Sequence, residues 1–493
     1  MSNKLPNGWT KGTLKEIVYS VKTGVPEFRG NKEYYSTGSI QNNTFIPEGE
    51  YSYKKRPSRA NRIAMKSDIF QARMKETDKG VFVDDKLSKQ LFSTGFLQLR
   101  PYGETYLSKL LFYLIISPTF LNQKNDLATG STQEALTDTN AVNLIIPLPP
   151  LNEQKRIVAK LDKIIPRIDA VKERLDKIPT IIKRFRQSVL SAAVTGKLTE
   201  KWREEHPDVE SAEVMLERIR KKHINLHKDK KSSKPKIPLP IKEEESKFEI
   251  DNTWKWCRLS QVTLKMSTGP FGSMLHKSDY ITNGIPVINP TNLINEKIVP
   301  SAKMMVSEST VERLSKYSLF QNDIVIARRG DLSKCGIITK KEEGWLCGTG
   351  SFFLKLGIEP VYFRLFYISD YCQTVLNSDA IGSTMANLNQ KVLSSIPFPL
   401  PPLKEQKEIV RQVDKLFDMA DKLEEHYQNA KKKVDKLTQS VLAKAFRGEL
   451  ASQDPNDEPA EKLLERILEE KAKMEIEIKK SKQKTRKRVK NML

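Results

Sequence analysis

Two basic clusters in the sequence carry the side chains best suited to binding a polyanion. The first follows an apolar run and contains Arg328, Arg329 and Lys334. The second, beside a pair of tyrosines, contains Lys54, Lys55, Arg56, Arg59 and Arg62. Arginine reads guanine edges through two hydrogen bonds, and both arginine and lysine hold phosphates. The clusters therefore predict contacts to DNA, with a plain solvated loop as the alternative for each.

Glycine-containing loops are a second kind of candidate, because a backbone without side chains can approach a phosphate closely. The run from Gly269 through Phe271 to Ser273 is such a loop and is a candidate DNA contact. A Gly-Ser-Thr run occurs twice, at 130–132 and at 382–384. We interpret this run as a turn, with a phosphate contact as the alternative.

No residue pattern in the sequence supports catalysis or metal binding. There is no GxxxxGK[ST] phosphate loop and no GxGxxG cofactor loop, and the run at 289–291 falls short of the Asn-Pro-Pro-aromatic pattern of adenine methyltransferases. His223 and His227 share a helical spacing but lack a third ligand. The acidic cluster at 457–462 lies on a predicted solvated helix. We therefore expect no catalytic site, no metal and no directly bound cofactor.

The composition indicates a polyanionic partner and a reducing compartment. The 493 residues contain 84 Lys and Arg against 61 Asp and Glu, a formal net charge of +23. This excess favours nucleic acid as the partner. The four cysteines form no CxxC pair and are interpreted as reduced thiols. No run approaches the roughly 18 apolar residues of a membrane span. These features predict a cytoplasmic protein without membrane contact.

The elements that must position the basic clusters are duplicated. PLPPLNEQKRIV at 147–158 recurs 252 positions later as PLPPLKEQKEIV at 399–410, and QSVL recurs at the same offset. The opening Asn7-Gly8-Trp9 recurs as Asn252-Thr253-Trp254, now 245 positions later. The interiors between these edges diverge almost completely. A repeat with this period predicts two modules rather than a solenoid.

Each copy continues into an apolar seam with alternating steps of four and three residues. The first seam contains Ile157, Leu161, Ile164, Ile168, Val171, Leu175, Ile178, Ile182, Phe185 and Val189. The second contains Ile409, Val413, Leu416, Ala420, Leu423, Tyr427, Ala430, Val434, Leu437 and Val441. Such spacing is typical of a coiled coil, and two matched seams in one chain are expected to pair. Separate packing of each helix on its own module is the alternative.

Because a whole module separates the two seams, the helices are expected to run antiparallel. The modules would then lie at opposite ends of a rod roughly 50 Å long, related by a pseudo-twofold axis. Pro166 and Pro179 lie inside the first seam and are expected to bend or break that helix locally.

The predicted fold class is α+β, with two mixed α/β modules joined by the two long helices. Strands are expected at 80–83, 96–99, 285–288, 323–327, 337–339 and 352–356, and one amphipathic helix per module at 104–116 and 361–376. The expected boundaries are 1–150 for the first module, 151–227 for the first long helix and central region, 228–250 for an extended linker, 251–402 for the second module, 403–450 for the second long helix and 451–493 for a short helix, repeated from 212–222, and a disordered basic tail. A phosphate-contacting arm is the alternative for the tail.

The duplicated motifs resemble one known family. PLPPLxEQKxIV after a GSTx3L loop, IKRFRQSVLSAAVTGKLTEKW at 182–202 and LTQSVLAKAFRGEL at 437–450 are similar to specificity subunits of type I restriction-modification enzymes, most closely the type IA branch. The resemblance covers nearly the whole chain. It implies two target recognition domains, each reading one half of a bipartite, asymmetric DNA site, and paired helices that fix the gap between the halves.

The same resemblance implies the partners of the chain. Two methyltransferase subunits and the restriction subunits would dock on it, and these partners would bind S-adenosylmethionine, ATP and Mg. The chain itself would then be non-catalytic. Two other classes remain open: a fused nuclease or methyltransferase that acts alone, and a coiled-coil scaffold that binds DNA or protein without a restriction-modification role.

Overall fold

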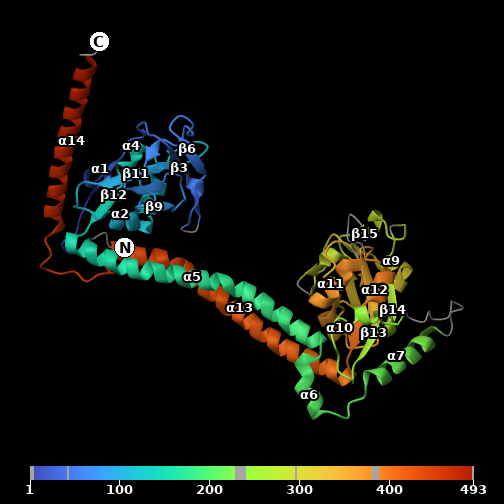
Figure 1. The fold of residues 1–493 in the computed structure, drawn as a ribbon. Helices are drawn as coiled ribbons and strands as arrows, with labels where there is room; N and C mark the ends of the chain where they lie inside the picture. The colour runs from blue at the N-terminus through green and yellow to red at the C-terminus, as the bar shows by residue number, and fades with distance from the viewer. Residues whose placement is uncertain are drawn as a thin grey trace. The chain divides into compact units, whose positions relative to one another are not determined.

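The computed structural model describes residues 5–41, 44–227, 240–271, 273–294, 297–379 and 388–490. The chain divides into two compact units, Met1–Asp176 with Gln428–Leu493, and Lys177–Tyr427. Each unit holds one mixed α/β module and part of each of two long helices (Figure 1).

The first module contains two four-stranded sheets. One has the order β2 (Val18–Ser20), β11 (Phe96–Pro101), β8 (Ile69–Ala72), β9 (Gly80–Phe82); the other has the order β6 (Gly49–Ser52), β3 (Asn31–Tyr35), β10 (Leu91–Phe92), β7 (Arg62–Ile63). Two further pairs are β1 (Thr10–Thr13) with β12 (Ile145–Leu148) and β4 (Ile40–Gln41) with β5 (Thr44–Phe45). The helices are α1 (Leu14–Ile17), α2 (Ser108–Ile115), α3 (Pro118–Asp126), α4 (Asp138–Ala141) and the 3-10 turn η1 (Thr37–Ser39).

The second module has a matching set of elements. Its sheets are β14 (Thr263–Thr268), β23 (Ser351–Leu356), β20 (Ile324–Ala327), β21 (Cys335–Ile337), and β15 (Tyr280–Ile281), β19 (Met305–Val306), β16 (Ile285–Ile288), β22 (Leu346–Cys347). The two-stranded pairs are β13 (Lys255–Arg258) with β24 (Pro397–Leu400) and β17 (Leu293–Ile294) with β18 (Lys297–Ile298). The helices are α8 (Leu259–Val262), α9 (Glu308–Arg313), α10 (Pro360–Tyr367), α11 (Asp370–Asp379), α12 (Gln390–Ser395) and the 3-10 turns η4 (Lys277–Asp279), η5 (Pro290–Asn292) and η6 (Ser315–Tyr317).

Strand pairing is repeated between the modules although their interiors diverge in sequence. The order β2-β11-β8-β9 corresponds to β14-β23-β20-β21. Each module also has one parallel pair, β3 with β10 and β16 with β22, and every other pair among the described strands is antiparallel. The predicted mixed and mostly antiparallel architecture is therefore confirmed. β8 and β20 are buried throughout, which explains their nearly continuous apolar sequences.

Several predicted elements have other bounds in the structure, and three of these differences have a local cause. The strand expected at 337–339 ends at Ile337, because the chain turns at Thr339, whose backbone N–H donates to Glu342 at 3.0 Å. The helix expected at 361–376 is split by Ser369, whose hydroxyl donates to the Phe366 carbonyl at 2.6 Å. Ser117 makes the equivalent 2.6 Å bond to Leu114 and separates α2 from α3, so each module has two helices where the pattern predicted one.

The long helices α5 (Leu151–Val194) and α13 (Leu403–Phe446) pair antiparallel within each unit. In the first unit Lys172 donates to Thr438 at 3.2 Å and Lys431 pairs with Asp176 at 2.5 Å. In the second unit Arg186 pairs with Asp421. The intramolecular pairing of the two seams is thereby confirmed within each unit.

Most seam residues lie where the heptad pattern places them. Ile157, Leu161, Ile168, Ile182, Ile409 and Val413 are buried, and Leu175, Val434 and Val441 are half-buried. Leu423 is 49% exposed, and Val171, Phe185 and Leu437 are also exposed, so these four lie outside the seam. Lys431 and Thr438 make contacts between the helices instead, one residue beyond Ala430 and Leu437, because the helical repeat of 3.6 residues drifts from the strict heptad.

The prolines do not break α5, so of the predicted local bend or break, the break is excluded. The helix is continuous from Leu151 to Val194 through both Pro166 and Pro179. Both prolines are exposed, so their rings and missing N–H groups face solvent while neighbouring seam residues stay packed. Packing along the seam therefore offsets the roughly 3 kcal/mol that an internal proline costs.

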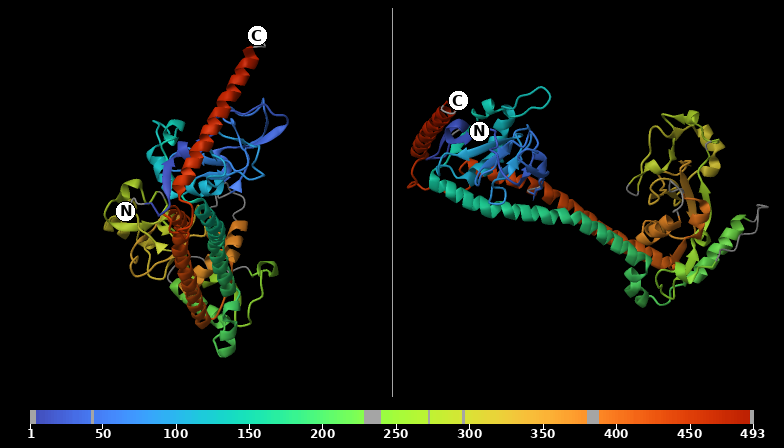
Figure 2. Two further views of the ribbon diagram at one scale, coloured as in Figure 1. Left: turned by 90° about the vertical axis from the view of Figure 1, so that its left-hand side faces the viewer. Right: turned by 45° about the horizontal axis from the view of Figure 1, so that its top comes forward.

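A shorter helix follows each long one and packs on the module of its own unit. These helices are α7 (Ala212–His227), after η2 (Lys197–Thr199) and α6 (Glu200–Glu205), and α14 (Ala460–Lys490), which lies along α1 and β1 (Figure 2). Ala212, Met215 and Ile219 are buried in α7, and Ala460, Leu463 and Ile467 repeat this pattern in α14. Within the described ranges, no helix combines the length and apolar character needed to cross a membrane.

Two segments expected to lack structure differ from that prediction. The tail is helical to Lys490, because it continues a helix already anchored by packing at its start. In the expected linker, residues 228–239 lie outside the described part of the chain. The following turn η3 (Glu243–Glu245) is held by Arg258, which pairs with Glu245 at 2.7 Å, so the linker is not extended there.

Candidate nucleic-acid interface

A β-hairpin in each module begins with an arginine in the same backbone setting. Arg73 follows β8 and Arg328 follows β20. The N–H of Arg73 donates to the Gly95 carbonyl at 3.0 Å, and that of Arg328 to the Gly350 carbonyl at 2.9 Å. Each arginine carbonyl also accepts a leucine N–H, from Leu136 at 2.8 Å and from Leu388 at 2.9 Å, respectively. The two arginines are therefore structurally equivalent.

A lysine at the far end of each hairpin is equivalent in the same way. Lys79 precedes β9 and its ammonium donates to the Thr37 carbonyl at 2.8 Å. Lys334 precedes β21 and donates to the Pro290 carbonyl at 3.3 Å. Both acceptors lie in the 3-10 turn after the parallel strand, η1 or η5. Each lysine thus ties its hairpin to the second sheet of its module.

Sequence reasoning identified Arg328 and Lys334 but missed Arg73 and Lys79. The signal was present as Ile-x-x-Ala-Arg followed by lysine six positions after the arginine, at 69–79 and 324–334. The Thr-Gly pair that accepts the arginine N–H, at 94–95 and 349–350, has the same offset of 255 positions. This third offset differs from the 245 and 252 found at the module edges, so it was hidden by small insertions.

The two arginine side chains are used differently. Arg73 donates to the carbonyls of Phe96 and Leu136, both at 3.1 Å, and pairs with Asp138 at 2.5 Å. Every nitrogen of its guanidinium therefore has a partner inside the module. Gln390 occupies the position equivalent to Asp138, 252 residues later, and supplies no carboxylate.

Among the described residues, the Arg328 guanidinium has no such partner. It lies 5.9 Å from the centroid of the Phe352 ring, and its Nε is buried without a hydrogen-bond partner. Arg329, the next residue, is exposed. The second hairpin therefore presents an arginine with unused donors at the position where the first hairpin has an internally bonded one.

The predicted loop at Gly269 is brought beside this hairpin. Gly269 N donates to the Ser351 carbonyl at 3.1 Å, next to Gly350, which accepts from Arg328. A Cβ on Gly269 would lie 2.0 Å from the Gly348 carbonyl, so the close backbone approach is to the protein itself. Phe271 is 53% exposed and Ser273 is exposed, and these residues form the outer surface of the loop.

The basic loop of the first module reaches the equivalent turn. The Arg59 carbonyl accepts a hydrogen bond from the N–H of Thr94 at 2.9 Å. The loop is therefore joined to the Thr-Gly turn whose Gly95 carbonyl accepts the Arg73 N–H. Lys54, Lys55 and Arg59 are exposed. Arg56 stacks on Tyr53, with 4.1 Å between the guanidinium carbon and the ring centroid. The loop therefore presents three exposed cations to solvent.

Arg62 does not belong to that loop, contrary to the prediction. It begins β7, is 2% exposed and donates to the Val21 carbonyl at 2.7 Å. Burial lowers the pKa of Arg62 to about 10. The residue is part of the module interior because strand β7 already begins at Arg62.

The duplicated PLPPLxEQK motif attaches each long helix to its own module. Trp9 Nε1 donates to Glu153 at 2.9 Å, and Trp254 Nε1 donates to Glu405 at 2.8 Å. Gln154 and Gln406 accept the N–H groups of Leu107 and Glu359, at 3.0 and 2.9 Å, where α2 and α10 begin. The motif is therefore a structural anchor that fixes the module on its helix.

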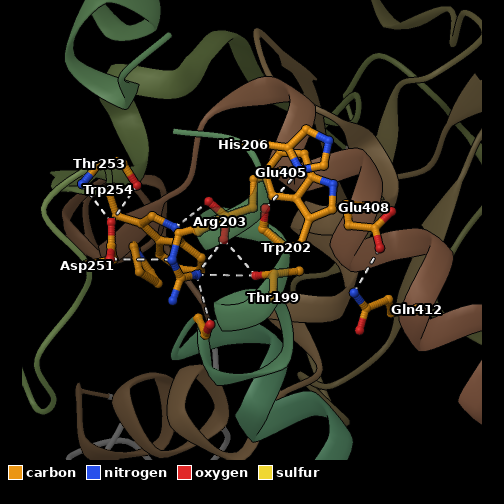
Figure 3. Close-up of polar contacts among 12 residues, drawn as sticks. Thr199, Trp202, Arg203, His206, Asp251, Thr253, Trp254, Glu405, Glu408 and Gln412 are labelled. Atoms are coloured by element: carbon orange, nitrogen blue, oxygen red, sulfur yellow. Dashed lines mark hydrogen bonds and ion pairs between the residues drawn. The ribbon is translucent and has the colours of Figure 1, made fainter. Parts of the chain in front are cut away.

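In the second unit this anchor includes a half-buried arginine. Arg203 from α6 donates to Glu405 at 2.5 Å and lies 3.4 Å from Asp251, while Thr199 donates to the same Glu405 oxygen at 2.6 Å (Figure 3). Position 451, equivalent to Thr199, is alanine in the first unit. One oxygen of Glu153 is accordingly buried without a donor, and burial raises the pKa of this carboxyl.

The remaining sequence candidates have structural partners. Asp457 pairs with Arg156 at 2.5 Å, which lowers the pKa of Asp457, and Glu458 pairs with Arg466. The first Gly-Ser-Thr run is a turn closed by two bonds between Thr129 and Ala135, whereas the second lies outside the described residues. Among the described residues, no group of three His, Cys, Asp or Glu side chains is placed to hold a metal.

Comparison with known proteins identifies the family. The pattern of the type I restriction modification DNA specificity domain matches residues 6–180 and 252–431, which together make up more than half of the chain. The chain belongs to this family of specificity subunits. The specificity subunit of the type I restriction enzyme EcoDI of Escherichia coli is 32% identical over 70% of this chain and 72% of its own length. That of EcoBI of Escherichia coli is 30% identical over 74% of this chain and 72% of its own length.

A solved structure supports the fold of a specificity subunit. The HsdS subunit from Thermoanaerobacter tengcongensis has a TM-score of 0.58 over 91% of this chain and 98% of that chain, at 23% identity. The resemblance to type I specificity subunits is thus confirmed. The two modules described above are the target recognition domains of such a subunit.

Proposed function

We propose that this specificity subunit reads a bipartite, asymmetric DNA site, with one half-site per module, and that it is itself non-catalytic. The observation that carries the proposal is the equivalent hairpin in both modules. Each hairpin is hydrogen-bonded to the equivalent Thr-Gly turn of its module. The first hairpin has an internally bonded Arg73, whereas the second has an Arg328 with unused donors. Two readers with one backbone and different side chains suit two different half-sites.

Positive charge supports DNA as the ligand. The exposed Lys54, Lys55 and Arg59 lie beside the Thr-Gly turn of the first module, and Arg329 lies beside that of the second. In the proposal these cations, with Arg56 and Lys334, bind phosphates, while Arg328 and the outer surface of the Gly269 loop contact bases. Arg62 is not included, because it is buried.

The proposal extends to the partners expected of the family. Two methyltransferase subunits and the restriction subunits would dock on the chain, bringing S-adenosylmethionine, ATP and Mg, and the complex would act in the cytoplasm. The methyltransferase must reach a base inside a duplex, so the complex would flip the target adenine. The paired helices α5 and α13 would fix the gap between half-sites.

A single-molecule methylome of the source cell, with and without the chain, tests this function. The expected result is a two-part motif with modified adenine that disappears on deletion and returns with the intact chain. Exchange of residues 10–145 for another such module should then change one half of the motif only. The proposal is contradicted if no motif disappears on deletion, or if both halves of the motif change on exchange.

The alternative is a scaffold that binds DNA or protein without a restriction-modification role. A scaffold that binds only protein would show no duplex binding with a steep dependence on salt. A DNA-binding scaffold would bind duplexes without a two-part sequence preference. Titration of the purified chain with a random duplex library at several salt concentrations separates these cases from the proposed function.

A further inference from the structure

Lys124 is a fully buried lysine whose ammonium is directed at the first hairpin. It lies on α3 and is 0% exposed. Its Nζ donates to the carbonyls of Met74 at 2.8 Å and Ala72 at 3.4 Å, and also to that of Thr77. A buried cation is costly unless such acceptors surround it. The Met74 and Thr77 carbonyls belong to the segment between Arg73 and Lys79, and Ala72 ends the strand before it, so the ammonium lies inside the turn of the hairpin.

The same turn is held at two other points. Asn125, the next residue of α3, accepts the N–H of Glu76 at 3.0 Å, and Glu76 has a φ of 61°. On the other side Lys75 pairs with Glu134 at 2.6 Å. A non-glycine residue in the left-handed region costs free energy, so the surrounding contacts must impose this conformation. As a result, the exposed side chains of Met74, Glu76 and Asp78 are presented from a fixed backbone.

The second module shows that the fold does not require this lysine. Position 376 is equivalent to 124, because Ser369 and Ser117 start the helices α11 and α3 in the same way. Leu376 is buried there, and the second hairpin is held instead by the Tyr367 hydroxyl, which donates to the Leu332 carbonyl at 2.8 Å. A buried lysine in the first module is therefore specific to its hairpin.

We propose that Lys124 is a positioning residue for DNA recognition by the first module, which holds the turn between Arg73 and Lys79 in the conformation that reads the first half-site. This inference rests on the proposed function. Lys124 contacts no base; its effect passes through the carbonyls of the turn to Met74, Glu76 and Asp78. Glutamate and aspartate accept from the cytosine amino group, and an apolar side chain contacts the thymine methyl group, so these exposed residues have the chemistry of base readers.

The test compares Lys124→Met with its matched control Leu376→Met in the full chain with its partner subunits. Methionine fills the volume of the lysine stem but supplies no donor. The methylome of cells with Lys124→Met should lose discrimination by about tenfold at one or more bases of one half-site, the effect of a weakened base contact. The other half-site and the gap should be unchanged, and Leu376→Met should leave both half-sites unchanged.

Thermal unfolding distinguishes positioning from a structural role. Lys124→Met removes a buried charge, which lowers the cost of folding, but it leaves the carbonyls of Ala72, Met74 and Thr77 without this donor, which raises that cost. Because the two effects oppose each other, the midpoint should change little while the sequence preference loosens. Lys124→Arg, which keeps donors near the turn, should restore part of the discrimination. If Lys124→Met fails to fold, Asn125→Ala provides a second variant, because it releases Glu76 N without touching the ammonium.

The outcomes separate this inference from the proposed function. A wild-type chain that specifies no two-part motif would overturn the proposed function. A wild-type motif with both half-sites unaltered in folded Lys124→Met and Asn125→Ala chains would overturn the positioning role alone. Equal loosening of both half-sites would also overturn it, since that result would indicate a general effect on the complex.

Discussion

Arg203 Nη1 donates to the buried Glu405 carboxylate at 2.5 Å, across 202 residues of sequence. The equivalent Glu153 in the first unit accepts from Trp9, and no described arginine forms an ion pair with it. The same duplicated glutamate is therefore a compensated charge in one unit and a partly uncompensated one in the other. This asymmetry gives the two units different responses to mutation and to pH.

Arg203→Ala should destabilise the second unit strongly. It removes the ion-pair partner of a buried carboxylate and leaves Glu405 with Thr199 and Trp254 as its donors among the described residues. We expect a loss of about 3 kcal/mol in the free energy of unfolding. Urea unfolding followed by the fluorescence of tryptophan, with Arg218→Ala as the control at an exposed ion pair, measures this loss. Equal losses in the free energy of unfolding for the two substitutions would show that the Arg203–Glu405 pair stabilises the unit no more than an exposed ion pair does.

The first unit should lose stability as the pH rises through the titration of Glu153. Burial raises the pKa of Glu153 in the folded state, so the folded chain binds more protons than the unfolded chain between the ordinary glutamate pKa and the raised value. Stability from this group is thus present at low pH and is lost as the pH increases through the folded pKa. Asp457 acts in the opposite direction, because its pairing with Arg156 lowers its pKa.

Glu153→Gln isolates the contribution of Glu153 to the pH dependence. The amide keeps an acceptor for Trp9 and removes the charge, so the fall in melting temperature above the ordinary glutamate pKa should become shallower. Differential scanning calorimetry between pH 4 and 8 compares the variant with wild type, and Glu405→Gln serves as the matched substitution in the second unit. Identical pH profiles for wild type and Glu153→Gln would contradict the assignment.

Arg73→Gln and Arg328→Gln should have different consequences. Arg328→Gln removes unused donors, so we expect DNA affinity to fall by about 1–3 kcal/mol at the cognate second half-site, with stability nearly unchanged. Arg73→Gln breaks a bonded network and leaves Asp138 without its partner, so the melting temperature should decrease. Competition binding and thermal unfolding of both variants test the contrast. If Arg73→Gln melts at the same temperature as wild type, the bonds of the Arg73 side chain do not stabilise the module.

The basic loop of the first module should contribute to the salt dependence of binding. Replacing Lys54, Lys55 and Arg59 with alanine removes three exposed cations, so the slope of log K against log salt should become shallower by about 2.7, or roughly 0.9 per phosphate contact. Alanine at Lys432, Lys433 and Lys436, exposed on α13, provides a control with equal charge loss. A control slope that changes as much would show that only net charge matters.

How much of this architecture the sequence predicts depends on whether a feature leaves a local pattern. The long helices follow directly from a seam in which Ile157, Leu161 and Ile168 recur at heptad spacing, and the structure buries all three. The continuity of α5 through Pro166 has no such local pattern, because it depends on the proline lying on the exposed side of the helix. Propensity is local, whereas the packing that overrides it is not.

The candidate site shows the same limit. Charge patterns identified Arg328 and Lys54 but also included Arg62, whose burial depends on a strand of two residues. Lys124 and Arg73 have no charge-cluster signal, since their roles come from carbonyls and carboxylates far away in sequence. Only the hidden repeat at 255 positions could have indicated Arg73, and nothing local marks Lys124 as buried.

The length of the paired helices should determine the gap in the DNA motif and nothing else. Insertion of one heptad in each helix, after Asp176 in α5 and after Tyr427 in α13, preserves the seam and adds about 10 Å at 1.5 Å per residue. At about 3.4 Å per base pair this corresponds to roughly three additional base pairs between the half-sites. The methylome of cells with the lengthened chain measures the gap. Insertions of two residues, which rotate the following turns of the helix by about 200°, serve as the control and should abolish methylation, because the apolar side chains would turn away from the partner helix. An unchanged gap in the seven-residue variant, with both half-sites still methylated, would mean that the partner subunits and not these helices set the distance.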